Sequence, residues 1–346
     1  MSDESLLASL DQRVRDEVRR VTTPGPVALL DFPNYGNPGD SAIWLGALAC
    51  LSALGFPPPV YTSESRTFDE RMLRRALPTG TILLMGGGNL GDLWPAAQVF
   101  RERVLRAFPD YPIVQLPQTI HFSDPARLEQ ARAQFRAHEN FTVLVRDARS
   151  LAIATDSLEC RARLCPDLAF CLTPAAEPAL RAARAGSQVE TLNLLRADHE
   201  AAGVALSGIH DSVDWTGDVP RAISRLARRL GDYLVRARSA GEPSVGERIA
   251  QRALAACYPA LARGRLQRGC RMLQSARVVV TDRLHGHVLA LLLGVPHVVI
   301  GDRNGKLRGF IDAWTSSSSL LRWASAPGDV PELTRELLGA GEATVP

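Results

Sequence analysis

The sequence predicts an α/β protein in which two doubly wound sheets of parallel strands face one cleft. Short apolar runs alternate with amphipathic stretches from residue 26 to about residue 174, and this alternation is typical of a parallel sheet covered by helices. An Ala- and Pro-rich segment, 173–188, then interrupts the pattern, which resumes afterwards. With 346 residues, the chain is long enough for two such domains.

The first predicted domain is residues 1–174. Its apolar runs predict strands that are buried on both faces; they are residues 27–32, 81–85, 113–116 and 142–145. Helical patterns lie between them, at residues 42–54, 95–108, 125–138 and 147–155. Residues 175–190 are interpreted as the linker to the second domain.

The second predicted domain is residues 191–346. Strands are expected at 191–195, 278–281 and 297–300, and helices at 221–238 and 284–293. Helical segments between residues 247 and 276 carry many Arg side chains. We interpret them as a solvated face whose aliphatic stems cover apolar surface. A surface for peripheral association with anionic membrane lipids is the alternative.

Composition excludes several classes of protein. Hydrophobic residues make up 46% of the chain and charged residues 22%, as in a folded protein rather than a disordered one. No apolar run reaches the ~20 residues of a membrane helix, and the N-terminus lacks the apolar core of a signal peptide, so we expect a cytoplasmic protein. A net charge of +3 without a binding motif argues against nucleic acid. Six cysteines without a C-x-x-C pair predict buried, reduced thiols and no metal site.

Two glycine-rich loops follow predicted strands, at the end of the strand where ligands bind in open α/β sheets. The first, residues 34–41, contains Asn34, Gly36 and Asp40. Asp40 and the next serine can cap the following helix, and open amides at a helix start can hold an anion. A capped turn with nothing bound is the plainer interpretation. The second loop contains Gly87, within three consecutive glycines, and Asn89, which follows them. Such a run of glycines is expected where backbone approaches a ligand closely.

Basic side chains occupy the other strand ends. Arg146 follows the strand 142–145 and can hold a phosphate or carboxylate with its planar fork, although a surface pair with the next aspartate fits equally well. Arg283 and His285 fall in the first turn of a helix, where the helix dipole favours anions. All but one of the 40 Lys and Arg residues are Arg, and the exception, Lys306, lies in a polar loop after the last strand. Together they indicate a cleft for a small, doubly anionic ligand.

Segments between about residues 32 and 314 carry a resemblance to a known family. They are NYGNPGDSAIW, GGGNLGDLW, QLPQTIHF, RDARS, CPDLAF, LLRADHE and VVVTDRLHGHVLALLLGVPHVVIG followed by NGKLRGF. In these segments the chain resembles the polysaccharide pyruvyl transferase family. The resemblance implies two Rossmann-like domains similar to GT-B glycosyltransferases, with the active site in the cleft between them. It also implies phosphoenolpyruvate as donor, a sugar or lipid-linked oligosaccharide as acceptor, and no metal or cofactor.

The resemblance also implies roles for single residues. Arg146, His285 and Lys306 match the donor-contacting positions by their place in the motifs, and Arg283 belongs to the same motif as His285. Asn34, Gly36 and Asp40 match the N-terminal loop that faces the donor.

The chemistry of ketal formation agrees with these residue types. His285 is the expected general acid because histidine is the residue type whose unperturbed pKa lies near the working pH, and Asp40 is the expected general base. Two alternatives remain: a GT-B-like glycosyltransferase that uses a nucleotide sugar, and a non-catalytic assembly protein that kept the fold.

Overall fold

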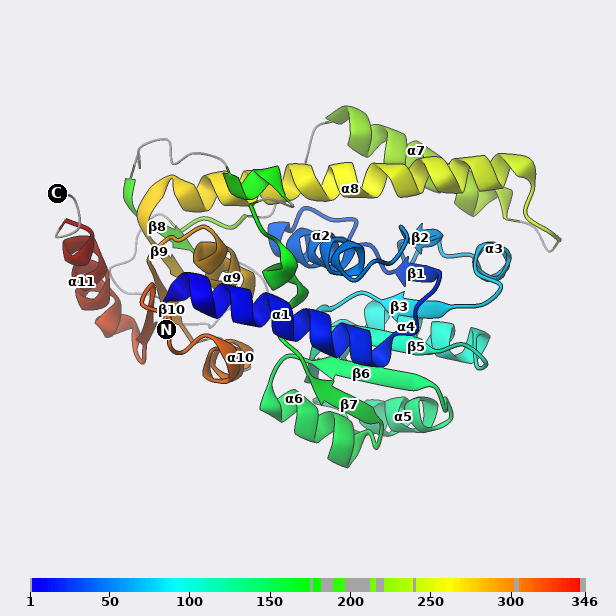
Figure 1. The fold of residues 1–346 in the computed structure, drawn as a ribbon, viewed down its shortest axis with the longest axis horizontal. Coiled ribbons are helices and arrows are strands. Elements are labelled where there is room, and N and C mark those ends of the chain that lie inside the picture. The colour runs from blue at the N-terminus through cyan, green and yellow to red at the C-terminus, as the bar shows by residue number, and fades with distance from the viewer. Residues whose placement is uncertain are drawn as a thin grey trace.

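The computed structural model describes residues 2–174, 177–181, 189–196, 212–215, 221–238, 241–301 and 305–342. Within them the chain forms two parallel sheets with helices packed around them, which confirms the predicted α/β class (Figure 1). The strands of the first sheet all precede residue 165, and those of the second all follow residue 188.

The first sheet has seven strands, all parallel. They are β1 (Val27–Leu30), β2 (Tyr61–Ser63), β3 (Thr81–Leu84), β4 (Gly87–Gly91), β5 (Ile113–His121), β6 (Phe141–Val145) and β7 (Arg161–Leu164). The order is β2-β1-β3-β5-β6-β7, and β4 also pairs with β5, beyond the end of β3. The apolar runs therefore became strands as predicted, whereas the second glycine-rich loop contains a strand that the sequence did not indicate.

The second sheet has four parallel strands in the order β11-β10-β9-β8. They are β8 (Val189–Leu194), β9 (Ala276–Thr281), β10 (His297–Ile300) and β11 (Leu321–Ala324). The first three were predicted from their apolar runs. Residues 189 and 190, expected in the linker, already belong to β8.

The described residues contain helices α1 to α11. They are α1 (Asp3–Val21), α2 (Pro38–Ala53), α3 (Glu70–Ala76), α4 (Pro95–Ala107), α5 (Pro125–Arg136), α6 (Ala148–Ala152), α7 (Arg221–Ala237), α8 (Val245–Gln274), α9 (Leu284–Leu292), α10 (Lys306–Trp314) and α11 (Val330–Glu342). Short helical turns lie at Ile153–Ser157, Leu168–Cys171, Pro178–Arg181 and Pro327–Asp329.

Two long helices, α1 and α8, run alongside both sheets (Figure 1). Helix α8 has 30 residues and begins at a capping box formed by Ser244 and Glu247. Its buried face packs on α2, so the Arg-rich segment is one helix that belongs partly to the core. Arg265 on this face is only 3% exposed, so this Arg side chain is buried as a whole and does not belong to the solvated face that was expected. At the start of α1, Asp3 accepts hydrogen bonds from two serines just before β11.

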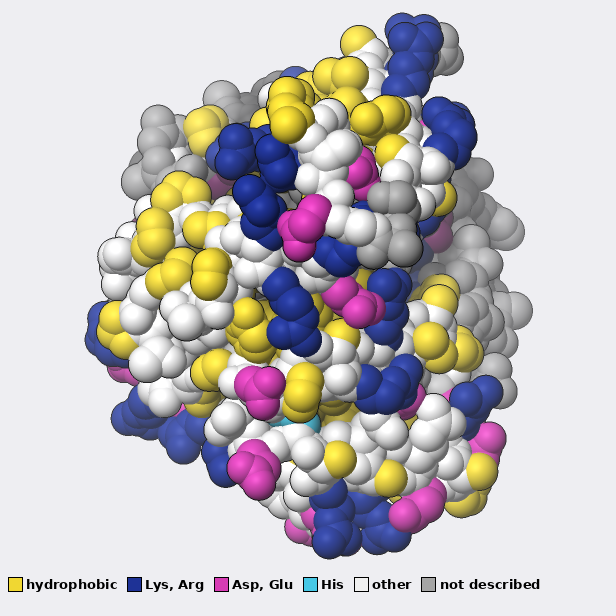
Figure 2. All heavy atoms as spheres, turned by 90° about the vertical axis from the view of Figure 1, so that its right-hand side faces the viewer, with side chains coloured by type: hydrophobic (Ala, Val, Ile, Leu, Met, Phe, Trp, Pro, Cys, Tyr) yellow, Lys and Arg dark blue, Asp and Glu magenta, His cyan; other side chains and the backbone are white. Residues whose placement is uncertain are grey.

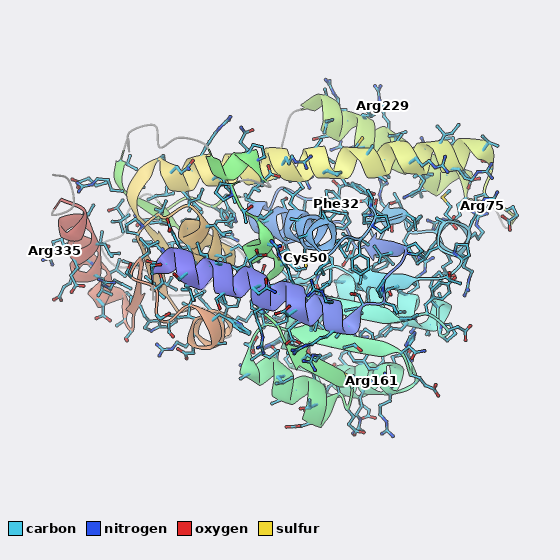
Figure 3. All side chains as sticks on the ribbon, in the orientation of Figure 1. Phe32, Cys50, Arg75, Arg161, Arg229 and Arg335 are labelled. Atoms are coloured by element: carbon cyan, nitrogen blue, oxygen red, sulfur yellow. The ribbon has the colours of Figure 1, made fainter. Side chains whose placement is uncertain are left out.

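One apolar core extends through the first sheet, α2, α8 and α9. Phe32 and Cys50 lie inside it, whereas Arg75, Arg229 and Arg335 lie at the periphery (Figure 3). The division into domains 1–174 and 191–346 stays a prediction, and most of the proposed linker lies outside the described residues.

Basic side chains at the α3 end of the molecule are interspersed with acidic ones (Figure 2). Several of them form ion pairs there: Arg66 with Asp232, Arg71 with Asp69, and Arg103 with Glu70. Lipid association of the Arg-rich helices stays a prediction. No helix among the described residues is long and apolar enough to cross a membrane.

Candidate active site

A cavity of about 680 Å³ opens where the carboxyl ends of strands from both sheets approach each other. Its walls contain every residue that the sequence analysis selected: Asn34, Gly36, Asp40, Gly87, Asn89, Arg146, Arg283, His285 and Lys306. They also contain residues that sequence reasoning missed, among them Asp31, Glu64, Trp94, Arg196, Trp215 and Asp282. The cavity is therefore the candidate active site.

Asp167 holds two of the predicted donor-binding side chains in place. Its Oδ2 accepts a hydrogen bond from Nη1 of Arg146 at 2.5 Å and lies 3.3 Å from Nε2 of His285. Arg146 is 2% exposed and also donates from Nη2 to Oγ1 of Thr119. Burial alone would raise the pKa of Asp167, but the charges of His285 and Arg146 outweigh it and hold this pKa well below its usual range. The sequence analysis did not select Asp167, although it follows the short strand β7.

The position of His285 explains a glycine in α2. A Cβ atom on Gly39 would lie 2.5 Å from Cβ and 2.8 Å from Nδ1 of His285, so no other residue leaves room for the imidazole. His287, two residues later, is buried and shares a 2.7 Å hydrogen bond with His297. Of the two histidines in the motif, only His285 lines the cavity.

Lys306 approaches the cavity from the second sheet. It is the first residue of α10, directly after Gly305, whose φ of 69° is left-handed. Its Nζ donates to the carbonyl oxygen of Gly88 at 3.4 Å. A Cβ atom on Gly88 would lie 3.8 Å from this Nζ and 3.5 Å from Nη2 of Arg146. Gly88 therefore lies next to two cationic groups. We call Arg146, Lys306 and the neighbouring His285 the cationic side of the cleft.

Arg283, like Arg146, is paired with a carboxylate. Its Nη2 lies 2.6 Å from each carboxylate oxygen of Asp214, and its side chain is 5% exposed. It precedes α9 as the N-cap residue, rather than lying in the first turn. The site therefore contains Arg283 as half of a buried ion pair.

Asn89 is oriented by a buried network. Its Oδ1 accepts hydrogen bonds from Gln118 at 2.8 Å and from Arg101 at 3.1 Å. Arg101 is 2% exposed, and burial lowers its pKa to about 10, so it stays charged at neutral pH. Because Oδ1 receives both donors, the Nδ2 donors of Asn89 are left for a ligand, and no described residue accepts from them.

The N-terminal loop forms its cap differently from the prediction. Helix α2 begins at Pro38, and Asn37 is its N-cap, accepting a hydrogen bond from the amide of Gly39. The same side chain donates to Oδ2 of Asp40 at 2.7 Å, and the hydroxyl of Tyr35 donates to that oxygen at 2.9 Å. Asp40 is therefore a hydrogen-bonded carboxylate within the first turn, and the cap amide that was expected to hold an anion is already satisfied.

Asn34 and Gly36 are held by Glu64 and by two Arg side chains of α8. Nδ2 of Asn34 donates to Glu64 at 2.9 Å, and its Oδ1 accepts from Arg265. The carbonyl oxygen of Gly36 accepts from Arg268. Both residues line the cavity, but these contacts hold them to α8 and Glu64 and not to the cationic side.

Asp31 is an acidic residue of the cavity wall with an unusual backbone conformation and a shifted pKa. It directly follows β1 and has a left-handed φ of 69°. Burial raises its pKa to about 6; Arg101 opposes this shift, and the charges of Asp40 and Glu64 add to it. Its sequence signal was an acidic residue at the end of an apolar run, VALLDF.

Comparison with known proteins agrees with this geometry. The model of the polysaccharide pyruvyl transferase family matches residues 37–304, which include Asp40, Gly87, Asn89, Arg146, Asp167, Arg283 and His285. The chain belongs to the polysaccharide pyruvyl transferase family. This confirms the resemblance found in the loop sequences and the expectation of a transferase.

Named relatives and one solved structure extend the comparison. The chain is 31% identical over 302 residues to pyruvyl transferase 1 of Schizosaccharomyces pombe, covering 85% of this chain and 71% of that protein. It is 28% identical to the putative pyruvyl transferase EpsO of Bacillus subtilis, covering 96% and 99%. An uncharacterised protein from Klebsiella pneumoniae shares the fold, with a TM-score of 0.59, 17% identity, and coverage of 92% and 99%.

Proposed function

We propose that the cleft transfers the pyruvyl unit of phosphoenolpyruvate to two hydroxyls of one sugar, forming a cyclic ketal and releasing phosphate. The observation that carries this proposal is the convergence of Arg146, His285 and Lys306 around the open space above Gly88. Phosphoenolpyruvate bears a carboxylate and a phosphate within a few bonds. A planar guanidinium, a compact ammonium and an imidazole together suit that ligand.

The same three groups suit the reaction. Ketal formation needs a proton at C3 of the enol ether, while a hydroxyl attacks C2 and phosphate leaves. His285 is placed to donate that proton, since its ring lines the cavity, is 11% exposed and is held 3.3 Å from Oδ2 of Asp167. Arg146 and Lys306 balance the charge of the phosphate as it departs.

The nucleotide-sugar alternative has less support. The family match and the names of the relatives point to pyruvyl transfer. A GT-B-like pair of domains, a lipid-linked acceptor and peripheral lipid association are further parts of the proposal.

Calorimetry and product analysis test the function directly. We expect phosphoenolpyruvate to bind and nucleotide sugars to bind much more weakly, because the cationic side is compact and carries two strong cations. With phosphoenolpyruvate and a set of neutral glycosides, phosphate release should accompany formation of a pyruvylated sugar, detected by mass spectrometry. Tight binding of a nucleotide sugar without binding of phosphoenolpyruvate would favour the glycosyltransferase instead.

Gly88→Ala tests whether the donor occupies the space above β4. The new methyl would keep ordinary contact distances of 3.5 Å to Arg146 and 3.8 Å to Lys306, so we expect the fold to persist. It would fill the space between the two cations, and the affinity for phosphoenolpyruvate should fall by about tenfold or more, or about 1.4 kcal/mol. Gly328→Ala, where nothing lies within 4 Å, is the matched control and should bind normally. Unchanged donor affinity in Gly88→Ala would place the donor elsewhere.

A further inference from the structure

The cleft has an acidic side opposite its cationic side, and the two meet at Gly87 and Gly88. A Cβ atom on Gly87 would lie 3.9 Å from Oδ1 of Asp40, whereas one on Gly88 would lie 3.5 Å from Nη2 of Arg146. Adjacent residues of one strand thus separate a carboxylate from a guanidinium. A reacting centre above these glycines is within reach of both.

Neighbouring strands bring the acidic side together. Leu30 and Ser63 are register partners at the ends of β1 and β2. The residue that follows each strand is acidic: Asp31 after β1 and Glu64 after β2. Asp40, from the first turn of α2, is the third carboxylate in this wall. Because parallel strands end at the same edge of the sheet, these acids emerge side by side into the cavity.

The three carboxylates differ in their hydrogen bonds. Oδ2 of Asp40 accepts from Tyr35 and Asn37, and Oε2 of Glu64 accepts from Asn34. No described residue donates a hydrogen bond to the carboxylate of Asp31, although it lines the cavity.

The backbone of Asp31 is unusual as well. Its φ of 69° lies in the left-handed region, where few residues other than glycine are found, and Asp is among those that tolerate it. The next residue, Phe32, turns inward and stacks on Tyr258 at 4.1 Å between ring centroids. The packing of Phe32 therefore fixes a conformation that leaves the neighbouring carboxylate at the cavity wall. Strained residues of this kind concentrate at functional sites.

We propose that the acidic side binds the acceptor sugar and that Asp31 is the base that accepts the proton of the attacking hydroxyl. This assignment rests on the proposed function and replaces Asp40 in that role. Asp40 and Glu64 have part of their accepting capacity occupied, and they bind further hydroxyls of the sugar. The acceptor is a neutral diol, because three carboxylates in one wall repel an anionic sugar such as a uronic acid.

The proton transfers balance. The first hydroxyl oxygen bonds to C2 and its proton moves to Asp31, while C3 takes a proton from His285. The second hydroxyl then attacks C2, and the bond between C2 and the phosphate oxygen breaks. The proton of this second hydroxyl leaves with the phosphate. Solvent takes the proton from Asp31 and returns one to His285, so no further reactant is needed.

The groups that face Asp31 set its pH dependence. Arg101 from α4 stabilises its charged form, whereas burial and the carboxylates of Asp40 and Glu64 disfavour it, which gives the pKa of about 6. A base must be deprotonated to act. The acid limb of the turnover profile should therefore lie near pH 6, with turnover rising as Asp31 loses its proton.

Asp31→Asn tests the assignment, since Asn also tolerates a left-handed backbone. We expect kcat to fall by about 10²–10⁴, the acid limb near pH 6 to disappear, and the Kd for phosphoenolpyruvate to change by less than about twofold. Asp110→Asn, at an exposed turn outside the cavity walls, is the control. Wild-type turnover with an unchanged pH profile in Asp31→Asn would overturn the base assignment while leaving the proposed function intact. Wild-type protein that fails to bind phosphoenolpyruvate would overturn the function itself.

Acceptor competition tests the same side of the cleft on the unaltered protein. A neutral methyl glycoside and the corresponding uronic acid are compared at saturating phosphoenolpyruvate. We expect kcat/KM to be at least about tenfold higher for the neutral sugar, and the gap to narrow in Glu64→Gln because one repelling charge is gone. Equal or better use of the uronic acid would contradict the acceptor assignment.

Discussion

His285→Gln is expected to lower kcat by about 10²–10⁴ while leaving the affinity for phosphoenolpyruvate within a few-fold of normal. In the wild-type protein, Oδ2 of Asp167 lies 3.3 Å from Nε2 of His285. Glutamine keeps a hydrogen-bond donor near Asp167, but its amide cannot act as a general acid. If the imidazole only held the phosphate, the loss would instead appear as weaker donor binding with near-normal kcat. Calorimetry and steady-state kinetics on one preparation separate these outcomes.

Solvent deuterium gives the His285 prediction a second readout. The ketal methyl gains its third hydrogen in the protonation step, so a solvent isotope effect on kcat is expected where this step limits the rate. His121→Gln, a substitution at the end of β5 outside the cavity walls, serves as the control and should behave as wild type. A His285→Gln protein with normal turnover at saturating donor would exclude the acid role.

Asp167→Asn is expected to reduce both stability and activity. The variant keeps the shape of the side chain but leaves Arg146, which is 2% exposed, without its charged partner. Removing one member of a buried ion pair costs about 3–5 kcal/mol in the free energy of unfolding. Donor binding should weaken as well, because Arg146 and His285 both lose the oxygen that positions them. Urea unfolding measures the first effect and calorimetry the second.

The pH dependence of the Asp167 effect has a definite sign. Its pKa in the folded protein lies below the unfolded value of about 3.9, so the charged form contributes stability above that pH. This contribution is lost as the pH falls further. The stability difference between wild type and Asp167→Asn should therefore be largest near neutral pH and shrink below about pH 4.

A surface ion pair provides the control for Asp167. Asp312 pairs with Arg308, and both side chains are about half exposed, at 53% and 54%. Asp312→Asn should change the free energy of unfolding by less than about 1 kcal/mol. A loss equally small in Asp167→Asn would mean that the buried pair contributes little to the fold.

Much of the fold could be predicted because buried parallel strands have a direct sequence signature. β1, β3, β6 and β10 are apolar runs that were recognised as strands, and each is buried along nearly its whole length. The missed strands lack that signature. β7 is RARL, with an alternating exposed pattern at the edge of the sheet, and β4 is GGNLG, which becomes a strand only because it pairs with β5.

The candidate site divides in the same way. Arg146, His285 and Lys306 could be selected because each stands at or near the end of a strand, where parallel sheets place their ligands. Asp31 and Asp167 also follow strands, but an acidic residue there looks like a cap or a turn until its neighbours are known. Arg283 was expected to hold the donor's charge, and its pairing with Asp214 could not be foreseen from a spacing of 69 residues.

The sequence by itself determined the alternation of strands and helices, the glycines at two strand ends, and the basic residue types of the site. Only the tertiary structure decided which charges are balanced and which remain available to a ligand. The interaction of two charges depends on their separation and on the water around them, and folding sets both. Asp167 and His285 are 118 residues apart in the chain and 3.3 Å apart in the cleft. Asp31 becomes a candidate base for the same reason, because folding places two further carboxylates beside it and partly buries it in the cavity wall.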